Sequence, residues 1–226
     1  MQRRKDLSTT SLNRLSKIWY SNNRVKIPTK LKIYKALTKS ILLYNCGTWA
    51  LTKTQEEHLD AFHRKQLRRV LGIRYPTKIS NSSLYKKTGE TRLSNTIRAS
   101  RWKLFGHVLR RDKSIPANKA MDFYFSKRSE KGFRGRRVTT LPITLVRDLD
   151  QVYTCATSLQ DHQYYRRLKL NNKDDLETLR SLAEDRTAWR RLVGKIVEAG
   201  KATHSIEDDA ESRSEGTLSV PYLADM

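Results

Sequence analysis

The sequence predicts an all-α protein, and three observations support this prediction. Apolar residues recur at intervals of three or four along most of the chain, which is the spacing of one helix face. Capping residues, glycines and prolines separate these runs. The clearest run covers residues 97–111, where Ile97 and Leu104 mark an apolar face that Arg101 shares, with Trp102 at its border. A face of this width has to pack against neighbouring helices.

The N-terminal third predicts a helical hairpin followed by a third helix. The first helix carries an apolar stripe over residues 12–19, and the second begins at Pro28, a first-turn position, and ends near 46–47. The third begins at a capping box of Thr54 and Glu57 and ends at Gly72.

The remaining helices are bounded by similar signals. Ser80 or Asn81 caps a short helix that ends at Gly89, and the central helix begins near Thr91. Three more helices are predicted at 140–152, 158–168 and 171–198, and Gly200 closes the ordered part.

We expect these helices to form two small sub-bundles, at 7–125 and 141–199. Residues 126–140 join them as a basic loop, because the glycines and arginines there lack helical periodicity. Residues 200–226 carry two basic and six acidic side chains and few apolar ones, which predicts a disordered acidic tail. The tail is either an inert terminus or a weak competitor that folds back onto the basic middle.

Positive charge is the main functional signal. The formal net charge is +23, and residues 60–140 hold 22 lysines and arginines against five acidic residues. Such a surface attracts polyanions, so nucleic acid is the expected partner. The alternative is that the charge serves only solubility.

Other partners and compartments receive less support. No apolar run has the length of a membrane helix, and the two cysteines are too far apart in sequence to indicate a disulfide framework or a paired zinc motif. The N-terminal 24 residues have a transit-peptide composition, but they also carry an ordinary core stripe. We therefore expect a nuclear or cytoplasmic protein rather than a mitochondrial or secreted one.

Catalytic, metal and cofactor sites are not predicted. Two-metal phosphoryl chemistry requires carboxylates held close together, whereas the acidic pairs Asp174–Asp175 and Asp208–Asp209 have structural explanations. His58 and His63 lack zinc-ligand spacing, and His107 either contacts phosphate or packs. No small-molecule substrate is indicated.

Four segments resemble one family, in the same order along the chain. They are LLYNCGTWALT at 42–52, LRRVLGI at 67–73, RWKLFGHVLR at 101–110 and AEDRTAWR at 183–190. Together they resemble the C-terminal end of the endonuclease/reverse-transcriptase proteins of non-LTR, LINE-type retrotransposons. The resemblance spans about residues 10–198. It implies the thumb and the following helices, which grip an RNA template or an RNA/DNA duplex without performing the chemistry.

The residues expected to contact phosphate follow from the charge peak and the basic loop. They are Arg68, Arg69, Arg101, Lys103, Arg110, Arg111, Arg134, Arg136 and Arg137, with Trp102 or Phe133 as candidates for base stacking. For Trp102, packing in the core is the stronger expectation. The fingers, palm, Tyr-x-Asp-Asp motif and endonuclease domain of the family have no counterpart here.

Three hypotheses remain open from the sequence. The chain is a non-catalytic nucleic-acid-binding module, or a subunit that completes a reverse transcriptase whose palm is supplied in trans, or a helical scaffold for protein interactions.

Overall fold

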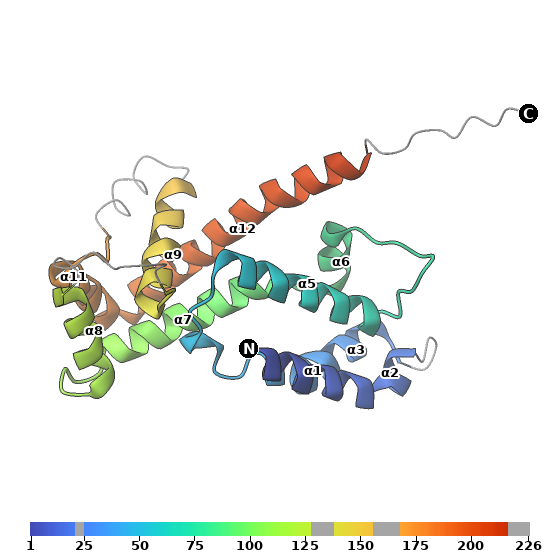
Figure 1. Cartoon of the computed structure of the whole chain (residues 1–226), viewed down its shortest axis with the longest axis horizontal. Helices are drawn as coiled ribbons and strands as arrows, with labels where there is room; N and C mark the ends of the chain where they lie inside the picture. Colours follow the sequence, from blue (N-terminus) through green and yellow to red (C-terminus); the bar gives the residue numbers. More distant parts are fainter. Residues whose placement is uncertain (21–24, 128–137, 156–167, 217–226) are drawn as a thin grey trace, which may run out of the picture.

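The computed structural model describes residues 1–20, 25–127, 138–155 and 168–216, and it confirms an all-α fold. Helices and loops account for these residues, and no strand occurs among them (Figure 1). The elements are α1 (Gln2–Arg14), α2 (Ser16–Tyr20), α3 (Ile27–Ile33), η1 (Tyr34–Lys39), α4 (Ser40–Leu42), η2 (Cys46–Thr48), α5 (Lys53–Val70), α6 (Asn81–Thr88), α7 (Leu93–Leu109), α8 (Pro116–Lys127), α9 (Leu141–Cys155), α11 (Lys173–Glu184) and α12 (Arg186–Gly216). The helix predicted at 158–168 and most of the predicted basic loop lie outside the described ranges.

The predicted N-terminal hairpin is present. Its second arm runs through α3, η1 and α4 without a break, and η1 is a π-helical stretch. The hydroxyls of Ser8 and Ser11 in α1 donate to the carbonyl oxygens of Thr38 and Leu37 in this stretch. The arm ends at Leu42, earlier than predicted. Asn45, with a left-handed φ of 57°, then turns the chain into η2.

The ends of α5 are set by local hydrogen bonds. The capping box consists of Thr52 and Gln55, two residues before the predicted pair, and each side chain accepts from the backbone N–H of the other residue. At the other end, Gly72 has a φ of 69°, and the N–H of Ile73 donates to the carbonyl of Arg68. This is a Schellman motif, and it confirms the predicted glycine stop.

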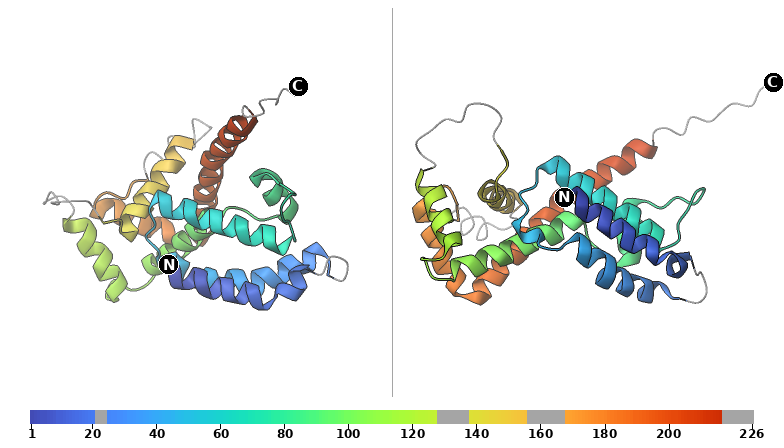
Figure 2. Two further views of the ribbon diagram at one scale, coloured as in Figure 1. Left: turned by 45° about the vertical axis from the view of Figure 1, so that its right-hand side comes forward. Right: turned by 60° about the horizontal axis from the view of Figure 1, so that its bottom comes forward.

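The central helix α7 connects two of the three apolar clusters in the described residues. Its first half, with Leu93 and Ile97, packs in one cluster, and its second half, with Trp102, Phe105 and Leu109, packs in another. It contacts α5 and η2 on one side, and α11 and α12 on the other (Figures 1 and 2). The apolar core therefore continues across the predicted boundary, and a division into two sub-bundles is not confirmed.

The predicted helix at 171–198 is two helices. The chain breaks at Asp185, whose side chain accepts from the N–H of Thr187 and whose carbonyl accepts from the N–H of Trp189. The N-cap of α12 thus interrupts the helix, although apolar residues of α11 and α12 belong to the same cluster.

The sequence predicts that the last helix closes at Gly200, whereas α12 continues to Gly216. Gly200 is buried where α12 crosses α7, and a Cβ there would lie 1.6 Å from Nη1 of Arg98. This glycine permits close approach of two helices instead of ending one. Beyond it, α12 extends away from the body of the protein (Figure 2). Residues 217–226 of the predicted tail lie outside the described ranges.

Candidate polyanion-binding surface

Arg101 and Trp102 are buried, which corrects the predicted role of Arg101 as a phosphate contact and of Trp102 as a stacking ring, and agrees with the stronger expectation that Trp102 packs in the core. Asp148 of α9 is fully buried and accepts from Arg98 Nε at 3.1 Å, Arg101 Nη1 at 2.8 Å and Trp102 Nε1 at 3.0 Å. Arg101 is 1% exposed and Trp102 0%, so neither can reach a ligand in solution. Their polar groups bind helix α9 to helix α7.

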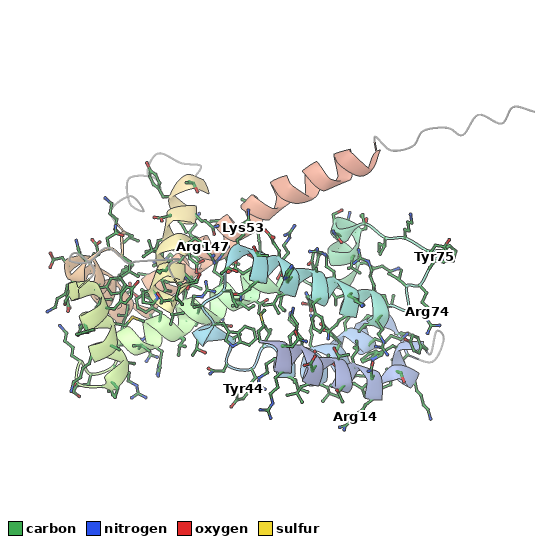
Figure 3. The ribbon with its side chains drawn as sticks, viewed as in Figure 1. Arg14, Tyr44, Lys53, Arg74, Tyr75 and Arg147 are labelled. Carbon is green, nitrogen blue, oxygen red and sulfur yellow. The ribbon has the colours of Figure 1, made fainter. Side chains whose placement is uncertain are left out.

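A second carboxylate extends this buried network to α5. Glu56 contacts Nη2 of Arg101 at 3.7 Å and Nη2 of Arg147 at 2.6 Å, and Arg147 also donates to the carbonyl oxygen of Leu51. Arg147 lies near the start of α5 (Figure 3). Burial raises the pKa of Glu56, while the surrounding arginines act in the opposite direction. Arg98 and Arg101 are therefore part of the structural core and unavailable for binding, whereas Arg147 is partly exposed and is held by Glu56.

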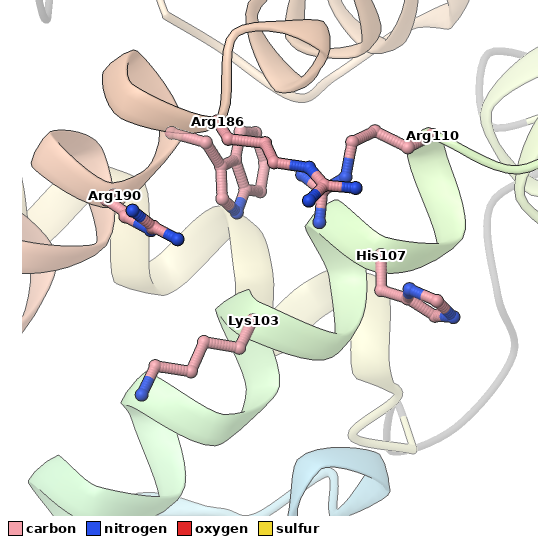
Figure 4. A pocket seen from close by; sticks show the side chains of 6 residues that line it. Lys103, His107, Arg110, Arg186 and Arg190 are labelled. Atoms are coloured by element: carbon pink, nitrogen blue, oxygen red, sulfur yellow. The ribbon is translucent and has the colours of Figure 1, made fainter.

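Exposed cations surround an open hollow between α7 and α12, which we call the α7–α12 hollow (Figure 4). It has a volume of about 350 Å³. Its lining residues are Lys103, His107, Arg110, Arg186, Trp189 and Arg190. Lys103, His107 and Arg110 recur along one side of α7, and Arg186 and Arg190 lie one turn apart on α12. Two helices thus present four permanent cations to one space.

The electrostatics of this hollow favour an anion. Arg186 is the first residue of α12, so the positive end of that helix lies beside the cations. Lys103, Arg186 and Arg190 are exposed, and Arg110 is oriented by a hydrogen bond from Nη1 to the carbonyl oxygen of Ala183. Cations held this close repel one another, and a bound phosphate relieves that repulsion.

Trp189 forms the floor of this hollow but is only 3% exposed. Its ring packs against Trp102 and Phe105, with centroid separations of 5.7 and 6.0 Å. The indole face is therefore closed to a nucleobase, and the exposed ring among the lining residues is the imidazole of His107.

Further cations surround a second hollow, at the C-terminal end of α5, which we call the α5 hollow. Its volume is about 280 Å³, and it is lined by Tyr20, Lys65, Arg68, Arg69, Gly72, Ile73 and Arg74. Arg68 donates to the carbonyl oxygen of Ile79 and to Oδ1 of Asn81, and Arg69 donates to Oδ1 of Asn13. These bonds orient the two arginines and leave Lys65 and Arg74 as the exposed cations of this hollow.

The predicted contact residues therefore fall into five groups. Lys103 and Arg110 line the α7–α12 hollow, and Arg68 and Arg69 line the α5 hollow. Arg111 is exposed just beyond α7 and lines neither. Arg101 and Trp102 are buried. The predicted residues of the basic loop, Phe133, Arg134, Arg136 and Arg137, lie outside the described ranges.

Sequence reasoning missed Arg186 and Arg190, which it placed outside the basic middle of the chain. A local signal was present, because the two arginines are four residues apart on a helix and flank Trp189. Their pairing with α7 could not be read from the sequence, since α7 and α12 meet through tertiary packing.

Cys46 and two of the described histidines, His58 and His63, differ in burial. Burial raises the pKa of Cys46, and His63 is fully buried whereas His58 is exposed. In the part of the chain that the structure describes, no three histidine, cysteine or acidic side chains are arranged to hold a metal ion. A search of the same residues finds no helix with the length and apolar character needed to cross a membrane.

Comparisons with protein-family models, with curated proteins and with solved structures find no match for this chain.

Proposed function

We propose that this protein binds the phosphate backbone of nucleic acid through the α7–α12 hollow, with little preference for base sequence. The observation that carries the proposal is the convergence of Lys103, Arg110, Arg186 and Arg190 on one open space. Phosphate contacts of this kind supply affinity that is independent of sequence. The burial of Trp189 supports the same conclusion, because it closes the largest ring of the hollow to a base.

The proposal includes an origin in the thumb and C-terminal region of a LINE-type reverse transcriptase. Two of the resembling segments, 101–110 and 183–190, supply all six residues of the α7–α12 hollow. A third, 67–73, supplies four residues of the α5 hollow. Three of the four resembling segments thus supply residues that line the two hollows.

We place this role in binding rather than catalysis because the buried carboxylates are used to hold helices together. Asp148 and Glu56 bind arginines, and Glu90 pairs with Lys35 and Lys39. Asp60 accepts from the backbone N–H and the hydroxyl of Ser94, at the start of α7. Each of these contacts joins two segments of the core.

The salt dependence of binding tests the proposal. The triple variant Lys103→Ala, Arg186→Ala, Arg190→Ala removes three exposed cations from the hollow. With a labelled DNA duplex, we expect the slope of log K against log salt to become less negative by about 2 to 3, since each phosphate contact contributes about −0.9 to that slope.

The matched control removes three exposed cations from other helices: Arg14→Ala, Lys32→Ala, Lys119→Ala. It changes the net charge equally and should alter the slope much less. Equal flattening by both variants would mean that net charge, not the hollow, accounts for binding. A wild-type protein without measurable affinity for RNA or DNA would refute the proposed function itself.

A further inference from the structure

We infer that the α5 hollow and the loop beside it form a second, chemically different site, which recognises an unpaired base together with its phosphates. The inference rests on the proposed function and assigns it a substrate class, single-stranded nucleic acid. The site combines the exposed cations Lys65 and Arg74 with the exposed rings of Tyr20 and Tyr75. Cationic grooves with aromatic side chains are the usual means of holding single strands.

The first step of the argument is the difference between the two hollows. Trp189, the ring in the α7–α12 hollow, is 3% exposed, whereas Tyr20 is 41% exposed and its ring lines the α5 hollow. Tyr75 follows Arg74 directly and is 93% exposed. Arg74 and Tyr75 lie on the loop between α5 and α6, at the edge of the molecule (Figure 3). Of the two hollows, the α5 hollow therefore has an exposed tyrosine ring beside its cations, whereas the exposed ring lining the α7–α12 hollow is the smaller imidazole of His107.

The second step is that this loop is anchored. Its first residues close the Schellman motif of α5, and the N–H of Thr77 donates to the carbonyl oxygen of Arg74. Further along, Arg68 donates to the carbonyl oxygen of Ile79 and to Asn81. Tyr75 is thus presented to solvent from a loop held at both ends, which lowers the entropy cost of binding a base.

The third step concerns Tyr20 and Arg74. The Arg74 guanidinium lies 3.9 Å from the centroid of the Tyr20 ring, which is a cation–π contact between two flat groups. A hydrogen bond from Arg74, followed by one from Arg69, lowers the pKa of Tyr20, as expected where positive charge is concentrated. A planar base can stack on either group, and the adjacent arginines can hold its phosphate.

This chemistry selects against duplexes. Bases in a duplex are already stacked and paired, so they reach an exposed tyrosine only at the expense of those interactions. An unpaired base gives up much less. The α7–α12 hollow is lined mostly by cations and its tryptophan is buried, so binding there depends much less on an unpaired base.

The test compares Tyr75→Ala with Tyr44→Ala on two probes, a labelled oligouridine and an RNA duplex of the same length. Tyr44 is a matched control because it is also an exposed tyrosine, 63%, with an arginine, Arg4, 4.4 Å from its ring centroid, but it lies away from the α5 hollow (Figure 3). Since Tyr75 is almost fully exposed, its removal should leave the fold unchanged, as circular dichroism checks.

We expect Tyr75→Ala to weaken binding of the oligouridine by about 5- to 150-fold, the range for loss of one base–aromatic stack, with the duplex affected less than about twofold. Tyr44→Ala should leave both affinities unchanged. The site is refuted if Tyr75→Ala matches Tyr44→Ala, or if it weakens both probes alike. In either case the wild-type protein still binds, so the proposed function stands.

Discussion

The indole N–H of Trp189 donates to the carbonyl oxygen of Trp102 at 3.1 Å, and the same indole lies against Gly106. A Cβ at position 106 would lie 2.2 Å from Nε1 of Trp189. This contact sets how closely the start of α12 approaches α7. It therefore also sets the spacing of the cations that the two helices present to the α7–α12 hollow.

The first prediction is that Gly106→Ala destabilises the protein. The methyl group has no space unless the Trp189 ring moves, and overpacking of a core costs about 1–3 kcal/mol. Urea unfolding measures the loss. The control is Gly194→Ala, at an exposed glycine of α12 where an added Cβ meets nothing within 4 Å. There the better helix propensity of alanine should stabilise the protein by about 0.5–1 kcal/mol, and an equal loss in both variants would contradict the close-contact explanation.

Local sequence signals predicted much of the fold but not the partners of its charged residues. Pro28, Ser80, Gly72 and Gly89 mark helix ends because capping depends on a few adjacent residues. Arg101 and Lys103 are both cations of the central helix, yet one is buried and one exposed. Helical periodicity placed Arg101 on the apolar face, but it could not reveal the partner that holds it there, because Asp148 is brought to Arg101 by tertiary packing.

The second prediction concerns this buried carboxylate. Asp148→Asn keeps the shape of the side chain but leaves Arg98 and Arg101 without their shared negative charge. Breaking a buried ion pair from one side costs about 3–5 kcal/mol, so we expect a large fall in the urea midpoint. Asp150→Asn, at an exposed position of the same helix, should change the free energy of unfolding by less than about 0.5 kcal/mol. Similar midpoints for the two variants would show that Asp148 is not needed to hold α7 and α9 together.

The third prediction is a pH dependence of stability that originates at His63. Burial, with a smaller contribution from Lys39, lowers the pKa of this histidine from 6.5 to about 3, and its ring lies between Tyr34 and Tyr85. The folded protein therefore keeps His63 neutral while the unfolded chain takes up a proton below pH 6.5. Stability is highest above pH 6.5 and falls as the pH drops from there toward 3. Between pH 7 and 5 the loss from this group is about 2 kcal/mol.

His63→Phe isolates that contribution, because an aromatic ring is retained between the tyrosines and the titrating group is removed. The free energy of unfolding, measured with urea, should fall between pH 7 and pH 5 by about 2 kcal/mol less in the variant than in the wild type. His58→Gln, at an exposed position on the same helix, is the control. An unchanged pH dependence in His63→Phe would mean that His63 becomes protonated without unfolding.

The last prediction resolves the α7–α12 hollow at the level of adjacent residues. Arg190 lines the hollow, whereas Arg191 is also exposed but does not line it, because successive side chains on a helix point about 100° apart. Each substitution by alanine removes one positive charge from the same turn of α12. We expect Arg190→Ala to flatten the salt dependence of duplex binding by about 1 unit and to weaken all sequences alike, as loss of one phosphate contact does. Arg191→Ala should leave the slope unchanged. Fluorescence anisotropy titrations at several salt concentrations give both slopes, and equal slopes for the two variants would show that the phosphate backbone does not bind between α7 and α12.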